Sequence, residues 1–266
     1  MTAPTAPAEK LLLLGGDFAR QHDYLSCLRL DGLSPATALT QQSIPTQDLA
    51  RLALDIVEGL DAQRMYHSPE IRTVYARVRQ LAHLAIDTAD HLLDAEDILD
   101  DTYAGVPAKG EGPLLTYRQA LETANSRLIL VRKLTAPAPQ DTLTAAELFV
   151  TERRRRGEIP PQQPPAFSPA QYTALRAVAR GEVTIADDKP YLHRDDWRIA
   201  LSTLRSLEDR GLVAREKCPL WLHDERVHLS ADGRRDLIAT FGRPPAPART
   251  AARPAPAPKA TPSRSL

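Results

Sequence analysis

Three side chains in the first half of the chain have types and a spacing that could bind a metal. His83, Asp87 and His91 follow one another at intervals of four residues, so they would share one face of a helix. Imidazole and carboxylate groups are ligands for transition metals. However, a metal site in a helical bundle takes ligands from facing helices, and the other predicted helices offer few inward-facing acids or histidines. We therefore interpret this column as a solvated helix face and predict no metal and no cofactor.

The sequence patterns typical of enzymes do not occur in this chain. It contains no glycine-rich phosphate loop, no Gly-x-Ser-x-Gly and no His-Glu-x-x-His. Its two cysteines, Cys27 and Cys218, lack neighbours that would lower a thiol pKa, and two are too few for a disulfide framework. We expect a non-enzymatic protein of the cytoplasm. The sequence also predicts no signal peptide, because the apolar run Leu11–Leu14 is short and no basic region precedes it. It predicts no membrane span, because no apolar run approaches about 18 residues.

Composition and charge limit the classes of partner. The 266 residues include 34 basic and 34 acidic side chains, so the formal net charge is zero. A neutral chain is not attracted as a whole to nucleic acid or to an anionic membrane. Any such binding must therefore come from a local group of charges. Hydrophobic residues make up 42% of the chain, enough for most of it to fold around a core.

Proline-rich segments divide the chain into four predicted parts. Residues 157–167 contain two Pro-Pro pairs, and prolines block helices and strands by removing a donor and fixing φ. We predict an extended linker there, between a domain at 1–156 and a second domain at 168–242. Residues 243–266, built from Pro, Ala, Arg, Thr and Ser with five basic residues and no acid, predict a disordered basic tail.

The pattern of the first part predicts a helical bundle. Apolar residues recur at helical spacing over 48–63 and again over 69–103, where Ser68 and Pro69 form a strong helix start. A further helix is expected to begin at Pro113. Thr144 has the spacing of a capping box and predicts a short helix that runs to Arg156. Three or four amphipathic helices with short loops are typical of an antiparallel bundle. We expect this bundle to serve self-association, as in a homodimer, or sensing.

A run of four arginines, 153–156, closes this part of the chain. Cations are favourable at the C-terminal end of a helix, so a solvated helix end is one interpretation. Contact with nucleic acid is the other.

The predicted domain at 168–242 alternates helices and strands. Ser168 starts a helix that ends before Gly181, and a short strand follows at 183–185. Residues 186–194 fit a loop or a hairpin. A second helix is expected from Asp195 to Arg210 with Trp197 on its inner face, and Gly211 stops it.

Two alternating segments, 212–216 and 226–229, then predict a pair of strands around an exposed loop that contains Trp221. Ser230 caps a last helix, 231–241. This order of elements resembles a winged helix-turn-helix domain of the MarR-like kind. The matching residues are Thr-Leu-Arg-Ser-Leu-Glu-Asp-Arg-Gly-Leu-Val at 203–213 and Val-His-Leu-Ser-Ala-Asp-Gly-Arg at 227–234.

The resemblance implies a DNA-binding transcriptional regulator. In that family the first stretch ends the recognition helix, which enters a major groove, and the second leads from the wing into the next helix. The resemblance places arginines of the helix at guanine edges or phosphates, a serine at a phosphate, and arginines of the hairpin near the backbone or minor groove. The implied contacts to double-stranded DNA are Arg194, Arg198, Ser202, Arg205, Arg215 and Arg226.

A protein-binding role is the alternative interpretation. Residues 166–242 hold 12 basic and 12 acidic side chains, whereas DNA-binding domains usually carry a basic patch. In this interpretation the winged helix and the acidic helix over 69–103 dock protein partners without catalysis.

Overall fold

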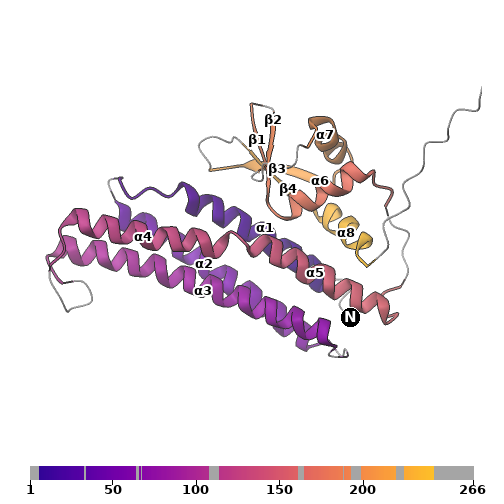
Figure 1. Cartoon of the computed structure of the whole chain (residues 1–266), viewed down its shortest axis with the longest axis horizontal. Helices are drawn as coiled ribbons and strands as arrows, with labels where there is room; N and C mark the ends of the chain where they lie inside the picture. The colour runs from indigo at the N-terminus through magenta and orange to yellow at the C-terminus, as the bar shows by residue number, and fades with distance from the viewer. Residues whose placement is uncertain are drawn as a thin grey trace, which may run out of the picture.

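The computed structural model describes residues 6–32, 34–63, 66, 68–107, 114–160, 165–187, 189–192, 199–219 and 225–242. The protein is mainly helical and carries one small antiparallel sheet (Figure 1). The fold class predicted from the sequence, a helical bundle followed by a smaller part with a β-hairpin, is confirmed.

The bundle is built from the first five helices. These are α1 (Ala6–Cys27), α2 (Pro35–Asp61), α3 (Pro69–Ala104), α4 (Tyr117–Thr135) and α5 (Ala138–Arg155). Helices α4 and α5 lie nearly end to end, so the bundle consists of four long rods (Figure 1). The closest pairs are α2 with α3, α3 with α4, and α1 with α5.

The ends of α3 follow from local chemistry that is visible in the sequence. The Ser68 hydroxyl accepts a hydrogen bond from the Ile71 N–H at 3.2 Å, and Pro69 occupies the first turn. Gly105 ends the helix in the left-handed conformation that its missing side chain permits. The prediction of one long helix over 69–103 is confirmed.

Several boundaries in the bundle correct the sequence prediction. Helix α1 was not predicted, and α2 begins at Pro35 and continues through Pro45 instead of starting near residue 48. Helix α4 begins after Thr116, whose hydroxyl caps it; Pro113 lies outside the described residues. Helix α5 begins at Ala138, so Thr144 is an interior residue whose hydroxyl donates to the Gln140 carbonyl at 2.8 Å.

The C-terminal lobe comprises the remaining elements. They are α6 (Pro169–Ala179), β1 (Val183–Ala186), β2 (Lys189–Leu192), α7 (Leu201–Asp209), β3 (Val213–Lys217), β4 (Glu225–Leu229) and α8 (Ala231–Thr240). The strands lie in the order β2-β1-β4-β3, and every neighbouring pair is antiparallel. The predicted strands over 183–185, 212–216 and 226–229 are confirmed, and residues 189–192, in the segment predicted as a loop or a hairpin, form β2, which pairs with β1. Helix α7 corrects the prediction, because it starts at Leu201 after an extended Ala200, not at Asp195.

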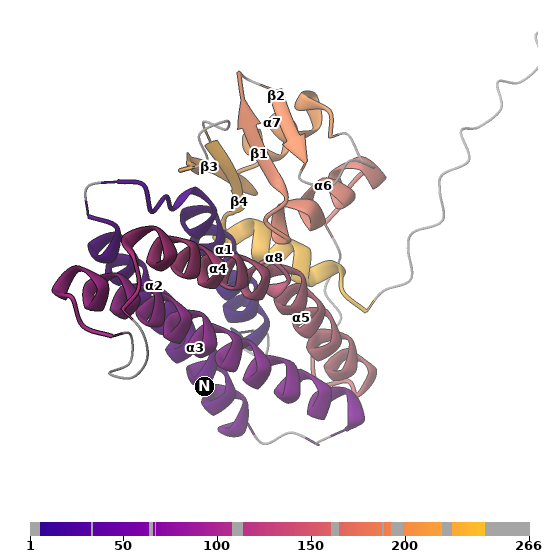
Figure 2. The same ribbon diagram turned by 60° about the vertical axis from the view of Figure 1, so that its left-hand side comes forward.

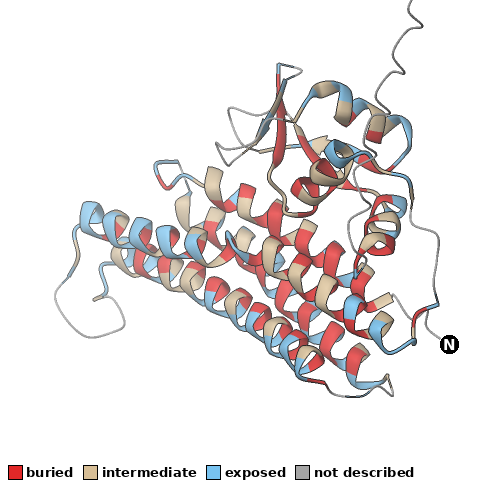
Figure 3. Ribbon diagram, turned by 45° about the vertical axis from the view of Figure 1, so that its right-hand side comes forward, coloured by how far each residue is buried: buried red, intermediate tan, exposed pale blue. Residues whose placement is uncertain are grey.

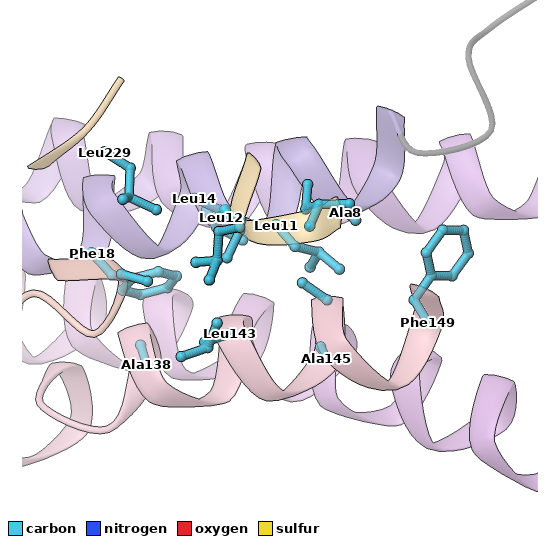
Figure 4. Packing of buried hydrophobic residues seen from close by; sticks show 14 of the residues in the cluster. Ala8, Leu11, Leu12, Leu14, Phe18, Ala138, Leu143, Ala145, Phe149 and Leu229 are labelled. Atoms are coloured by element: carbon cyan, nitrogen blue, oxygen red, sulfur yellow. The ribbon is translucent and has the colours of Figure 1, made fainter. Parts of the chain in front are cut away.

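One hydrophobic cluster runs from the bundle into the C-terminal lobe. It joins side chains of α1, such as Leu14 and Phe18, to Leu143 and Phe149 of α5 and to Leu229 of β4 (Figure 4). A second cluster fills the other end of the bundle, between α3 and α4. Buried positions line the faces where the helices meet and continue into the sheet (Figure 3). The lobe therefore rests on α1 and α5, as Figure 2 shows.

The predicted linker contributes to this core. Ile159 is buried, and Phe167 packs against the same cluster. Residues 161–164 and the whole predicted tail, 243–266, lie outside the described residues. The division into a domain at 1–156 and a second at 168–242 stays a prediction.

Candidate nucleic-acid interface

Helix α7 is fixed to the C-terminal lobe by one side. Leu204 and Leu207 are fully buried, and the Gln171 side-chain amide of α6 donates to the Ser206 hydroxyl at 3.0 Å. The main neighbours of α7 are α6 and β3, and the helix lies on the side of the lobe away from the bundle (Figures 1 and 2). This packing leaves the opposite side of α7 in solvent.

The outward side of α7 carries two of the predicted DNA-contacting residues. Ser202 and Arg205 are exposed and lie three residues apart, so they are neighbours on the helix surface. Asp209 is exposed as well. Arg210 stacks on the Phe167 ring, with its guanidinium carbon 4.8 Å from the ring centre. The described charges on this side of α7 are therefore mixed in sign.

Arg215 of β3 is engaged within the protein. Its guanidinium forms ion pairs with Glu208 of α7 at 2.5 Å and with Glu225 of β4 at 3.2 Å. The hydrogen bond to Glu208 raises the pKa of the Arg215 guanidinium above its ordinary value. The Arg215 side chain is about one quarter exposed, but two carboxylates already neutralise its charge.

Arg226 of β4 is not at the surface, which corrects the prediction that it faces DNA. The residue is only 3% exposed. Its guanidinium pairs with the Asp23 carboxylate of α1, at 2.5 Å for the Nη2–Oδ1 contact, and also donates to the Gly181 carbonyl. The Cys218 thiol lies 3.5 Å from the same carboxylate. Arg226 therefore joins the C-terminal lobe to the bundle, and we remove it from the candidate interface.

The other two predicted contacts, Arg194 and Arg198, lie outside the described residues, as do Trp197 and Trp221. Their roles stay predictions. Ile199, which lies inside the helix predicted from Asp195 to Arg210, packs against the hydrophobic core. The reason is that residues 199 and 200 precede the helix and do not follow its periodicity.

The arginine run 153–156 is also bound within the protein. Arg154 donates to the carbonyls of Ile238, Ala239 and Phe241, at 3.1 Å for Ala239, and so holds the C-terminal end of α8 against α5. A cation is favourable at that end of a helix. The side chains of Arg155 and Arg156 both pair with the carboxylate of the buried Glu152. These contacts explain the run without nucleic acid.

Sequence reasoning missed the contacts that attach the lobe to α1. Arg20 pairs with Asp17 on its own helix at 2.9 Å and with Glu216 of β3 at 3.1 Å. The only signal in the sequence was a charged residue, Asp23, within an otherwise apolar helix face; its partner is 203 positions away.

The column of His83, Asp87 and His91, which was interpreted as a solvated helix face, lies at the bundle surface. His83 and Asp87 are exposed and His91 is half-buried. Among the residues that the structure describes, no group of three or more His, Cys, Asp or Glu side chains is placed to hold a metal ion. Within the same residues, no helix has the length and apolar character needed to cross a membrane.

Comparison with known proteins identifies no relative of the chain. No protein family, no curated protein and no solved structure matches the chain.

Proposed function

We propose that this chain is a DNA-binding regulator that reads DNA with α7 and the β3–β4 hairpin, as a winged helix domain does. The observation that carries the proposal is the topology of the C-terminal lobe. A helix precedes β1, α7 leads into β3, and β4 returns between β3 and β1 before α8 follows. This is the order expected of a winged helix, with the hairpin β1–β2 in place of the usual second helix.

The orientation of α7 supports the same function. The bundle lies against the opposite side of the lobe (Figure 2), so the outward side of α7 is open to a DNA groove. Ser202 and Arg205 supply a hydroxyl and a guanidinium on that side, and both groups bind phosphates or base edges. In this proposal Arg194 and Arg198 extend the contact, the bundle gives self-association or sensing, and the protein is cytoplasmic.

The experiment is selection of bound duplexes from a random double-stranded pool, followed by fluorescence anisotropy with the selected duplex. Arg205→Glu should weaken binding at least tenfold, because it removes a contact of about 1–3 kcal/mol and adds repulsion. The matched control is Arg72→Glu, the same change at an exposed position of α3 in the bundle. Absence of any enriched duplex, or equal binding by the two variants, would overturn the proposal.

Protein docking is the second candidate function, and a specific observation favours it. Arg215, one of the predicted DNA contacts, is already held by two carboxylates, and α3 exposes Asp87, Asp90 and Asp97. An acidic helix surface suits a basic protein partner. This function predicts that Asp87→Lys with Asp90→Lys abolishes capture of a partner while DNA binding is unchanged. Retention of the partner by that variant counts against it.

A further inference from the structure

A cavity of about 300 Å³ lies where the C-terminal lobe meets α1. We call it the seam cavity. Its walls come from α1, from the end of α6, from β4 and from the first turn of α8. A volume of this size is at the lower end of the range for small-molecule sites.

The polar groups of the seam cavity are cationic or neutral. None of the described lining residues is an aspartate or a glutamate, whereas Arg20, Arg226, His228 and Arg234 all line it. Arg226 is already neutralised by its buried partner from α1, and Arg20 is held by carboxylates on both sides. The cavity thus has an excess of donors over acceptors.

Arg234 is engaged less closely than the other two arginines. Its Nη1 donates to the Leu229 carbonyl at 2.9 Å, and its charge acts on the nearby Asp17, but no described carboxylate lies within ion-pair distance of it. The residue lies in the first turn of α8, and the cap residue Ser230 and its neighbour Ala231 also line the cavity. The N-terminal end of a helix carries partial positive charge and N–H donors. A guanidinium and a helix start therefore face the same space.

His228 is a second polar side chain that lines the cavity. Its Nδ1 is buried without a hydrogen-bond partner among the described residues and lies 3.9 Å from the Glu216 carboxylate. Burial is the main cause that lowers the pKa of the His228 ring. Arg20 and Arg234 lower it further, and Glu216 acts in the opposite direction. An anion bound beside this ring would act in the same direction as Glu216 and raise the pKa of the ring.

The remaining walls are apolar. Leu12 and Leu13 of α1, Val178 of α6 and Leu229 of β4 line the cavity. Gly16 leaves open space in the middle of α1, because a Cβ built there meets no atom within 4 Å. An apolar body attached to the anionic group would bury these surfaces.

We infer that the seam cavity binds a small organic carboxylate. Its carboxylate group meets Arg234, the His228 ring and the start of α8, and its apolar part lies against Leu12 and Val178. Because the ligand contacts both the bundle and the lobe, it stabilises their docked arrangement. The inference goes beyond DNA binding and does not depend on it.

The test is isothermal titration of the full chain with hexanoate, with hexanamide as the uncharged match and inorganic phosphate as the anion without an apolar body. Hexanoate should bind, and hexanamide and phosphate should each bind at least tenfold more weakly. No binding of hexanoate overturns the inference. Equal binding of hexanamide shows that charge plays no part, and equal binding of phosphate shows that the apolar part plays none; either result overturns it.

Three variants locate the site: Arg234→Gln with its matched control Arg235→Gln, and Gly16→Leu. Arg234→Gln should weaken hexanoate binding at least tenfold, whereas Arg235→Gln, at the exposed neighbouring position, should change it less than twofold. Gly16→Leu should abolish binding by filling the cavity, and it keeps a good helix former in α1 so that the fold is retained. Wild-type affinity in the Gly16→Leu variant would overturn the assignment.

The His228 ring provides a readout that a purely structural effect would not move. The pKa of this ring is measured by NMR with and without hexanoate. Hexanoate should raise it in the wild type and leave it unchanged in Gly16→Leu. The charged groups that face the ring, Arg20, Glu216 and Arg234, are present in both proteins. An unchanged pKa in the wild type under saturating hexanoate contradicts the placement.

Discussion

Arg205 and Arg226 belong to the same lobe and were predicted to meet the same DNA, yet the structure gives them opposite surroundings. Arg205 lies in solvent on the outward side of α7. Arg226 is buried against α1 with its charge paired to Asp23. The comparison teaches that an arginine in a DNA-binding pattern indicates an interface only where no other part of the chain covers it.

The two sides of the C-terminal lobe therefore differ in what their charges do. Where the lobe meets the bundle, Arg226 of β4 pairs with Asp23 of α1, and Arg154 of α5 donates to carbonyls at the end of α8. On the outward side, Ser202 and Arg205 support no other element through a described contact. Changes on the first side should cost stability, and changes on the second should cost only binding.

The largest effect is expected from Asp23→Ala. It leaves the buried guanidinium of Arg226 without its carboxylate, and loss of one partner of a buried ion pair costs about 3–5 kcal/mol. Urea unfolding followed by circular dichroism measures the change in the free energy of unfolding. Asp31→Ala is the matched control, because the Arg29–Asp31 pair is exposed and exposed ion pairs contribute little to stability. A loss below about 1 kcal/mol for Asp23→Ala would contradict the buried placement.

The next effect, smaller than that of Asp23→Ala, is the difference in stability between Gly181→Ala and Gly211→Ala. Both glycines have positive φ, 66° and 68°, so both variants should lose about 1 kcal/mol from backbone strain. At Gly181 the new Cβ would also lie 2.5 Å from the Cβ of Ala19 in α1, whereas at Gly211 it meets no atom within 4 Å. Gly181→Ala should therefore lose about 1–2 kcal/mol more. If urea unfolding showed equal losses of unfolding free energy for the two variants, α1 would not pack closely against Gly181.

Arg154→Ala should be milder still. The variant loses hydrogen bonds from a charged donor to the last carbonyls of α8, but these carbonyls lie near the helix end, where water can replace the donor. We expect a loss of about 1–2 kcal/mol. Arg51→Ala, in an exposed pair, should change stability by less than about 0.5 kcal/mol. If Arg154→Ala lost as little stability as Arg51→Ala, the contacts from Arg154 would not stabilise α8 against α5.

Local signals explain the parts of the fold that the sequence predicted. Ser68 and Ser168 cap their helices through contacts three residues away, and Gly211 ends α7 by its own backbone. Such signals lie within a few residues of one another, so a single sequence reveals them.

The missed features depend on contacts between distant segments. Helix α2 passes through Pro45, and the carbonyl of Gln42 in the same turn accepts from Gln21 of α1 at 3.2 Å. A proline inside a helical pattern normally predicts a break, and nothing near it shows that α1 lies alongside. The burial of Arg226 has the same origin, since its partner from α1 is distant in the sequence. The outward placement of Ser202 and Arg205, in contrast, followed from helical periodicity alone.

The pH dependence of stability gives the most specific difference, at the end of α5 where the arginine run meets a buried acid. Hydrogen bonds from Arg155, and then from Arg156 and Ser68, lower the pKa of Glu152 to about 2 although its burial opposes this. The native carboxylate thus holds its proton less tightly than in the unfolded chain, where its pKa is about 4.3. Its contribution to stability is complete above about pH 4.3 and is lost as the pH falls toward about 2.

Glu152→Gln removes this titration while keeping the side-chain shape. In urea unfolding between pH 6 and pH 2, the free energy of unfolding of the wild type should fall more steeply than that of the variant. The two curves should converge at the acid end, because the protonated glutamate and the glutamine that replaces it are both uncharged. Parallel curves would contradict the lowered pKa of Glu152. They would mean that solvent screens Arg155, which is 63% exposed, and that the burial of Glu152 offsets its ion pairs with the two arginines.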